Sequence, residues 1–245
     1  MSATRLNKYI ASSGLCSRRK ADELIEHGAV MVNGKKITEL GFQVKEKDKV
    51  FVNNKLIHPI KHQYYRFYKP AGYITTSDDE KGRKTIYDLL PDELTGLKPV
   101  GRLDKDSTGL LILTNDGELI QELTHPSVKV PKVYLVQVGG LLHPHQLETL
   151  AKGVEIEPGK IAYADIEVLE ADNKHTMMRI TLYQGMNRQI RKMFEYIGYE
   201  VKSLKRIQHA TIQLTGLKRG EFKPIKPAQI KELRNFLNRL AQKND

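Results

Sequence analysis

One polar segment holds most of the residues whose types could do chemistry. Residues 101–109 read GRLDKDSTG, and two glycines there bracket a polar loop that leads into the apolar run 110–113. Such a loop would hold polar side chains at a sheet edge on a rigid base. Asp104 has the chemistry of a nucleophile or base, and Arg102 that of a phosphate or base contact. The alternative is a structural turn in which Asp104 and Asp106 bond backbone amides.

A basic amphipathic segment, residues 187–198, could supply a partner for that carboxylate. Its apolar residues follow helical spacing and a glycine ends the pattern, which predicts a helix. They are Ile190, Met193, Phe194 and Ile197. With Ile190 at the centre of the apolar face, Arg188 projects to the opposite side, and Arg191 lies about 100° round, at the border with solvent. A border arginine can turn inward and pair with Asp104. The alternative is a solvated arginine.

Tyr134, Cys16 and two histidines are the remaining candidates, and each also fits a structural role. Tyr134 lies in the alternating run 133–138, where a half-buried sheet tyrosine is ordinary. Cys16 is expected to be a small packed residue, since no paired histidine is indicated. His143 and His145 flank a proline and are expected to face solvent. The single cysteine excludes a disulfide framework and any multi-cysteine metal site, and we predict no metal.

The elements that must position these residues fall into two predicted domains. Pro59 and its polar neighbours interrupt two apolar-rich segments. We therefore expect a first domain at residues 1–57, a linker at 58–63 and a second domain at 64–245. The first domain is the more basic of the two per residue.

In the first domain, two predicted helices are followed by strands. The local signals are a helix-ending glycine, a capping serine and two hairpin turns. They are Gly14, Ser17, Asn33-Gly34 and Asn53-Asn54. Arg18, Arg19 and Lys20 occupy the first turn of the second helix, where the helix dipole disfavours cations. Because a helix N-terminus favours phosphate, binding of an RNA backbone explains these cations better than a solvated basic face does.

The second domain is predicted to combine strands and helices in an α+β fold. Its strand-like runs are residues 64–68, 73–76, 110–113, 133–138 and 178–182. A C-terminal helix begins at Pro227. Successive strands are often too close for helical crossovers, so we expect a mixed, largely antiparallel sheet with flanking helices. A small N-terminal α/β domain would precede it.

Composition restricts the class of protein. The chain of 245 residues has a net charge of +11 and a pI near 9.5, which indicates a polyanionic partner, nucleic acid before anionic membrane. Hydrophobic residues make up 40%, enough for an ordinary core. No apolar run approaches a membrane helix in length, and none follows the charge at Arg5. We therefore expect a cytoplasmic protein with no membrane segment and no signal peptide.

A spaced pattern runs through the first domain at residues 5–10, Gly14, 17–22 and 32–34. It resembles the RNA-binding domain named after ribosomal small-subunit protein S4. The resemblance implies RNA binding but no reaction, because this module is attached to unrelated enzymes and to non-enzymes. The expected RNA-binding residues are Arg5, Lys8, Arg18, Arg19 and Lys20.

Three further motifs occur in order along the second domain. The first joins residues 101–104, 107–111 and 113–117, the second is 132–134 and the third is 185–193. They resemble the RsuA/RluB/RluE/RluF group of ribosomal RNA pseudouridine synthases, and with the first domain the resemblance spans almost the whole chain. Gln184 departs from the pattern, since many members have Glu there, and this bears on the subgroup rather than on the reaction.

This resemblance implies an isomerase that converts uridine to pseudouridine in ribosomal RNA, in 23S rather than 16S rRNA. Asp104 would be the catalytic aspartate that breaks the N1–C1′ bond, whether it attacks the sugar or stabilises positive charge on it. Tyr134 would stack on the uracil and help remove the C5 proton, and Arg191 would pair with Asp104. The expected substrate-binding residues are Arg102, Lys132, Arg188 and Ile190.

An isomerisation has no net redox change, so no cofactor is expected. The partner would be ribosomal RNA or a ribosomal subunit assembly intermediate, and the protein would be a monomer. Two alternatives stay open. A non-catalytic rRNA-binding or ribosome-assembly factor would explain the charge but not the ordered motifs. A metal-dependent phosphoesterase could use Asp104, Asp106 and Asp116 as magnesium ligands, without the usual histidine or glutamate spacing.

Overall fold

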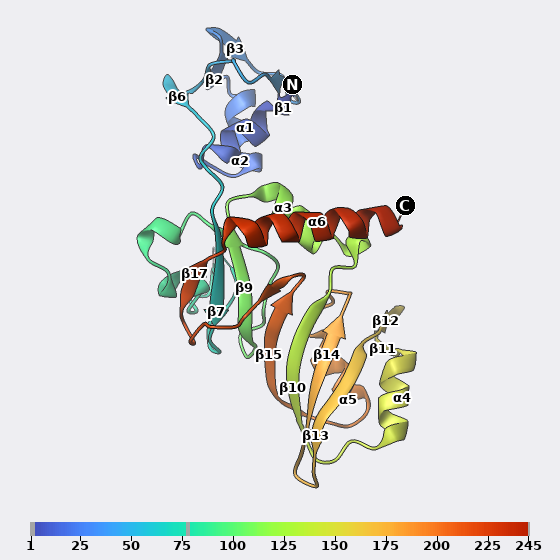
Figure 1. Cartoon of the computed structure of the whole chain (residues 1–245). Helices are drawn as coiled ribbons and strands as arrows, with labels where there is room; N and C mark the ends of the chain where they lie inside the picture. Colours follow the sequence, from blue (N-terminus) through green and yellow to red (C-terminus); the bar gives the residue numbers. More distant parts are fainter. Residues whose placement is uncertain (1–2, 77–78, 245) are drawn as a thin grey trace. The chain divides into compact units, whose positions relative to one another are not determined.

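A computed structural model describes residues 3–76 and 79–244. The chain divides into two compact units, residues 1–63 and 64–245. Figure 1 follows the chain through both units from its blue to its red end. Among the described residues, none of the helices is long and apolar enough to cross a membrane.

The first unit packs two helices on a small antiparallel sheet. The helices are α1 (Leu6–Ser12) and α2 (Arg18–Glu26). The four-stranded sheet has the order β3-β2-β5-β6, and β1 pairs with β4 beside it. These strands are β1 (Thr4–Arg5), β2 (Val30–Val32), β3 (Lys35–Ile37), β4 (Gln43–Val44), β5 (Val50–Val52) and β6 (Lys55–Ile57). Leu6, Ile10, Ala21 and Ile25 bury the helices against the valines of β2 and β5.

Local signals in the sequence account for the turns of this unit. Asn33 and Gly34 have φ angles of 50° and 79°, and Asn53 and Asn54 have 49° and 64°. Both pairs connect antiparallel strands, β2 to β3 and β5 to β6. Positive φ at both central residues defines the tight turn that matches strand twist. The two predicted hairpins are therefore confirmed.

The second unit is built on a nine-stranded sheet (Figure 1). Its main path runs β13-β14-β10-β15-β9-β7-β17, with β16 paired to β15 and β8 paired to β9. These strands are β7 (Tyr64–Lys69), β8 (Lys98–Pro99), β9 (Thr108–Thr114), β10 (Lys132–Gly139), β13 (Asp165–Ala171), β14 (His175–Leu182), β15 (Val201–His209), β16 (Ile212–Gln213) and β17 (Phe222–Pro224). The pairs are antiparallel except β15 with β9, which are parallel. The prediction of a largely antiparallel α+β sheet is confirmed.

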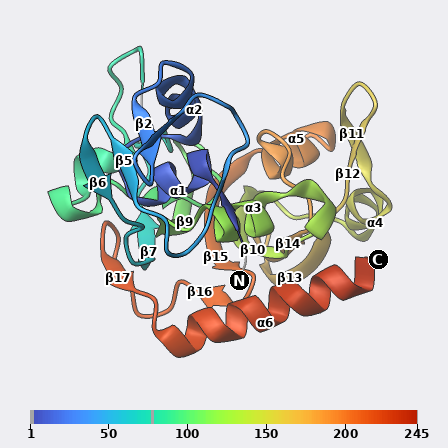
Figure 2. The ribbon, with the colours of Figure 1, turned by 90° about the horizontal axis from the view of Figure 1, so that it is seen from above.

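Helices and a separate hairpin flank this sheet. The α-helices are α3 (Gly117–Thr124), α4 (Pro144–Lys152), α5 (Gln189–Tyr196) and α6 (Pro227–Asn244). Three short 3₁₀ helices are η1 (Ile86–Leu89), η2 (Asp92–Leu94) and η3 (Pro126–Val128), and β11 (Val154–Glu157) pairs with β12 (Lys160–Ala162). α6 runs across the strand direction (Figure 1), and Figure 2 shows it along its length. It packs with α3 over β9 through Leu119, Leu233 and Leu237.

The expected strand at residues 73–76 does not form. Ile74 makes a single bridge to Thr85 instead. The reason is that β7, which precedes this segment, already has β9 on one side and β17 on the other. The segment therefore leaves the sheet, and Thr75 bonds the loop that contains Asp104.

Candidate active site

Residues from all three motifs of the second unit line one cavity of about 330 Å³. The loop before β9, the start of β10 and the loop before α5 each contribute to its wall. Six of the predicted site residues lie there: Arg102, Asp104, Lys132, Tyr134, Arg188 and Ile190. Arg191 is not among the lining residues. The cavity therefore joins segments far apart in sequence.

A buried lysine fixes the loop that bears Asp104. Lys69, at the end of β7, is fully buried, and its Nζ donates to the carbonyls of Asp104 (3.0 Å), Ser107 (2.9 Å) and Pro70 (3.1 Å). A longer contact of 3.4 Å reaches the Lys105 carbonyl. Burial lowers the pKa of Lys69 to about 8, while the charges of Asp104 and Asp106 oppose that shift. The ammonium thus remains mostly protonated at neutral pH and can donate to several carbonyls at once.

Thr75 holds the other side of the same loop. Its hydroxyl donates to the Leu103 carbonyl at 2.8 Å and accepts from the Leu103 amide at 3.2 Å. The Asp104 carboxylate, by contrast, makes no hydrogen bond or ion pair with the residues that the structure describes. The structural alternative, a turn in which this carboxylate bonds backbone amides, is therefore not what forms. An aspartate left unpaired beside a cavity is available to a bound molecule.

Gly109 allows two strands to meet beside this loop. Its φ is +110°, and a Cβ there would lie 2.2 Å from the Arg206 carbonyl oxygen and 2.6 Å from the Arg206 nitrogen. Gly109 and Thr108 are the residues through which β9 pairs with β15. No other residue type fits this approach, because the atoms in contact belong to the backbone.

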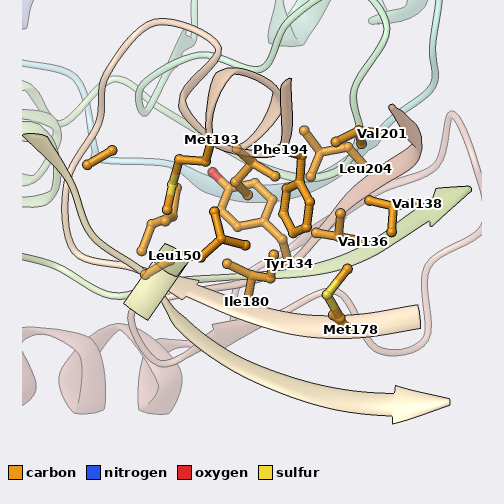
Figure 3. Packing of buried hydrophobic residues seen from close by; sticks show 14 of the residues in the cluster. Tyr134, Val136, Val138, Leu150, Met178, Ile180, Met193, Phe194, Val201 and Leu204 are labelled. Carbon is orange, nitrogen blue, oxygen red and sulfur yellow. The ribbon is translucent and has the colours of Figure 1, made fainter. Parts of the chain in front are cut away.

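Tyr134 combines a packed ring with a position on the cavity wall. It is 8% exposed and belongs to the apolar cluster between β10 and α5. Figure 3 shows its ring among Ile180, Met193 and Phe194, with the hydroxyl directed toward Met193. Tyr134 is therefore packed more deeply than a half-buried sheet tyrosine, and its ring also lines the cavity, where a flat ligand could contact it.

The predicted ion pair between Arg191 and Asp104 is absent. The Arg191 guanidinium donates instead to the carbonyls of Val201 (3.1 Å) and Asp106 (3.4 Å). α5 begins only after Arg188, whose left-handed φ of 50° turns the chain into the helix. From that start Arg191 reaches the beginning of β15 and the backbone of the loop. Arg191 therefore binds the backbone of the loop and does not pair with the Asp104 carboxylate.

Several residues of the site were not predicted. Gln189 is 3% exposed, and its Nε2 donates to the Tyr163 carbonyl (3.3 Å) and to Gln184 Oε1 (3.2 Å). Gln184 also accepts from the Tyr163 amide at 3.0 Å, so these two glutamines tie the loop before α5 to the end of β12. Lys69 directly follows the predicted strand 64–68 and gave no other signal. Arg206 and His209 also line the cavity, but they belong to β15 (Val201–His209), a strand that was not predicted.

The basic residues expected to bind RNA lie in the first unit. Ser17 caps α2 by accepting from the Lys20 amide at 3.2 Å, as predicted. Arg18, Arg19 and Lys20 are exposed in the first turn, and Lys20 forms an ion pair with Glu23 at 2.7 Å. The remaining two residues of the expected set are Arg5, which is exposed, and Lys8, which is partly buried.

The magnesium site of the phosphoesterase alternative does not form. Asp116 caps α3 and accepts from the Tyr64 hydroxyl (2.8 Å) and from Arg234 (2.5 Å), and it does not line the cavity. Within residues 3–76 and 79–244, no three His, Cys, Asp or Glu side chains come together as metal ligands would.

Comparison with known families agrees with this site. Residues 4–56 match the S4 domain, and residues 63–196 match the family described as RNA pseudouridylate synthase. The fold and the site thus define an RNA-modifying enzyme with an RNA-binding unit of its own. The chain belongs to the RNA pseudouridylate synthase family, whose members isomerise uridine within RNA.

Individual relatives resemble the chain over nearly its whole length. It is 42% identical to "Ribosomal large subunit pseudouridine synthase B" of Bacillus subtilis (strain 168), over 94% of this chain and 95% of the relative. It is 40% identical to "Dual-specificity RNA pseudouridine synthase RluF" of Escherichia coli (strain K12), over 95% of this chain and 79% of the relative. A solved structure, "Crystal structure of pseudouridylate synthase", superimposes with a TM-score of 0.68 at 29% identity, over 94% of this chain and 99% of that one.

Proposed function

We propose that this enzyme converts a uridine of ribosomal RNA to pseudouridine, in 23S rather than 16S rRNA, and that Asp104 is its catalytic aspartate. The observation that carries the assignment of Asp104 is its unpaired carboxylate, which lies on the cavity wall in a loop fixed by Lys69 and Thr75. The preference for 23S rRNA is supported by the relative of Bacillus subtilis, which is named for the large ribosomal subunit.

The reaction first needs the target base outside its stack. Removing a base from a duplex costs a few kcal/mol, and stacking on an aromatic ring returns about 1–3 kcal/mol per base. Tyr134 offers that ring on the cavity wall. Arg102, which lies in the same wall, would contact the RNA beside the displaced base, and Ile190 would bound the pocket.

The chemical steps then follow at Asp104. Breaking the N1–C1′ bond builds positive character on the sugar, and the nearby carboxylate stabilises or traps it. The uracil rotates, C5 bonds to C1′, and the proton on C5 is lost while N1 gains one, so the product is an isomer of the substrate. Tyr134 would assist in removing the C5 proton. The reaction as written requires neither a metal nor a cofactor.

Other residues would hold the substrate or the site. Arg191 is assigned a positioning role, through its bonds to the backbone at Asp106 and Val201. Arg188 and Lys132 would bind the substrate in the cavity. RNA outside the cavity would be bound by the basic residues of the first unit: Arg5, Lys8, Arg18, Arg19 and Lys20. We place the enzyme in the cytoplasm, as a monomer acting on ribosomal RNA or on an assembling subunit.

Tritium release from rRNA labelled at uridine C5 tests the proposal, because the new C–C bond displaces that tritium. The native protein should release tritium from 23S rRNA, and Asp104→Asn should not. Release by both proteins would remove Asp104 from its catalytic role. Release by neither, on both rRNAs and on ribosomal particles, would contradict the proposed substrate.

A further inference from the structure

A bulge in β15 places two cationic side chains and a histidine around one end of the cavity. Lys132 of β10 lies opposite His209 of β15, and Tyr134 lies opposite Arg206. Residues 206 and 209 are three apart, so a regular strand would point them to opposite faces. The register shift between Val133 and Tyr134 inserts one extra residue and resets that alternation. Arg206 and His209 therefore both line the cavity with Lys132.

Arg206 and His209 are buried and Lys132 is partly buried, and each has unused hydrogen-bonding capacity. Arg206 is 2% exposed; its Nε donates to the Leu110 carbonyl at 2.7 Å, but its Nη2 has no partner. His209 is completely buried; its ring contacts the Leu123 backbone, but neither ring nitrogen makes a hydrogen bond of normal geometry with the described residues. Lys132 Nζ reaches one acceptor, the Val130 carbonyl at 3.2 Å. Buried donors normally have partners, so Arg206 in particular is left with a donor that a ligand can use.

The charges of the group point to an anion. Burial, and then the charge of Arg206, lowers the pKa of Lys132 to about 8. Burial, followed by the charges of Arg206 and Lys132, holds the pKa of His209 well below its usual value despite a contact with the Leu123 backbone, so its ring is neutral. The cations thus repel one another. Asp104 is the one acidic side chain among the described residues that line the cavity, and it forms no ion pair with them.

We propose that Lys132, Arg206 and His209 form a subsite for a phosphate group of the RNA strand, beside the position of the uracil on Tyr134. This inference rests on the proposed function, since it names a second part of the same substrate. A base carbonyl would satisfy one of the unpaired donors but would leave two desolvated cations without a counter-charge. A phosphate supplies the negative charge and several acceptor oxygens, which suit both an arginine and a lysine.

Nucleotide binding to the full-length protein tests the subsite without any turnover. The ligands are uridine, uridine 5′-monophosphate, uridine 3′-monophosphate and inorganic phosphate at constant ionic strength. Binding is followed by NMR of labelled histidine rings, with the His209 signal assigned from His209→Gln. We expect at least one monophosphate to bind about tenfold more tightly than uridine, the gain from one or two charge-assisted hydrogen bonds. Inorganic phosphate should move the His209 signal and compete with that nucleotide.

Lysine variants assign the preference to this group. Lys132→Gln should reduce the difference between the monophosphate and uridine to about twofold or less, and Lys132→Arg should preserve it, because a cation remains. Lys205→Gln is the matched control. It is the same substitution at a residue of β15 that does not line the cavity. Its difference should equal that of the native protein.

Two results would overturn the subsite. One is equal binding of uridine and both monophosphates by the native protein. The other is a Lys132→Gln variant that weakens uridine as much as the monophosphates, which would indicate recognition of a base oxygen. The proposed function fails differently: a phosphate preference without tritium release would remove the reaction and keep the subsite, whereas release without any preference would remove the subsite alone.

Discussion

Replacing Lys69 with methionine should uncouple the catalytic loop from the sheet. The change keeps most of the unbranched stem of the side chain and removes the donor shared by the carbonyls of Pro70, Asp104 and Ser107, all within 3.1 Å. A buried carbonyl that loses its donor costs about 1–3 kcal/mol, so three of them cost about 3–9 kcal/mol. Removing the buried ammonium returns about 3 kcal/mol, because its pKa falls from 10.5 to about 8 on folding. The net loss in the free energy of unfolding should therefore be about 0–6 kcal/mol, with a midpoint of about 3 kcal/mol.

The same change should also slow catalysis. Asp104 belongs to the released loop, and a displacement of about 1 Å from the productive geometry costs about 100-fold in rate. We therefore expect single-turnover tritium release by folded Lys69→Met to slow about 100-fold, with RNA affinity nearly unchanged.

The assay pairs thermal unfolding followed by circular dichroism with tritium release below the unfolding temperature. Lys174→Met is the control, because Lys174 is exposed in the turn between β13 and β14 and the substitution removes the same charge. It should match the native protein in both measurements. A Lys69→Met enzyme that releases tritium within about threefold of the native rate would refute the account of how this loop is held.

Three further perturbations have defined outcomes. Gly109→Ala should lower the free energy of unfolding, measured by denaturant titration, by at least about 3 kcal/mol, and Gly216→Ala by only about 1 kcal/mol. Both glycines have positive φ, but of the two only Gly109 faces backbone atoms within 3 Å. Equal losses would contradict the close approach of β9 and β15. Arg18→Glu combined with Arg19→Glu should weaken RNA binding at moderate salt and reduce the dependence of affinity on salt concentration, with little change in the single-turnover rate on bound RNA. Unchanged binding would show that the first turn of α2 does not contact RNA. Affinity for the preferred uridine monophosphate should fall as the pH rises above about 8, because Lys132 has a pKa of about 8 in the free protein and the anion binds its protonated form. The titration starts at about pH 7, where the phosphate, whose second pKa is about 6, is already a dianion. An affinity that stays level or rises over this range would refute the role of Lys132.

Local signals made parts of this structure readable from the sequence. The turns at Asn33-Gly34 and Asn53-Asn54, the Ser17 cap and the amphipathic segment around Ile190 each depend on residues within a few positions of one another. The ordered motifs likewise predicted most of the cavity wall. In these cases the chemistry of a short segment decides its conformation, and tertiary packing adds to that choice without reversing it.

Long-range packing decided what the sequence did not show. Lys69 binds a loop some 35 residues away, and that partner is invisible in the strand that carries it. The bulge in β15 cancels the alternation by which Arg206 and His209 would have been assigned to opposite faces. The predicted ion pair between Arg191 and Asp104 was wrong for a similar reason. Arg191 binds the carbonyl of Val201, and the sequence does not show that β15 begins beside α5.

The position of β15 also determines when, during synthesis of the chain, the active site can assemble. β7 and β9 form one half of the sheet, and β10, β14 and β13 form the other; within the main path β15 joins them. Asp104 precedes β9 in the first half, whereas Tyr134 lies on β10 in the second. During synthesis each half can pair its own strands as it leaves the ribosome, but the two sides of the cavity acquire a common hydrogen-bonded frame only once residues 201–209 have emerged. A chain that stops before that point would possess its aspartate and its tyrosine without the strand that brings them together.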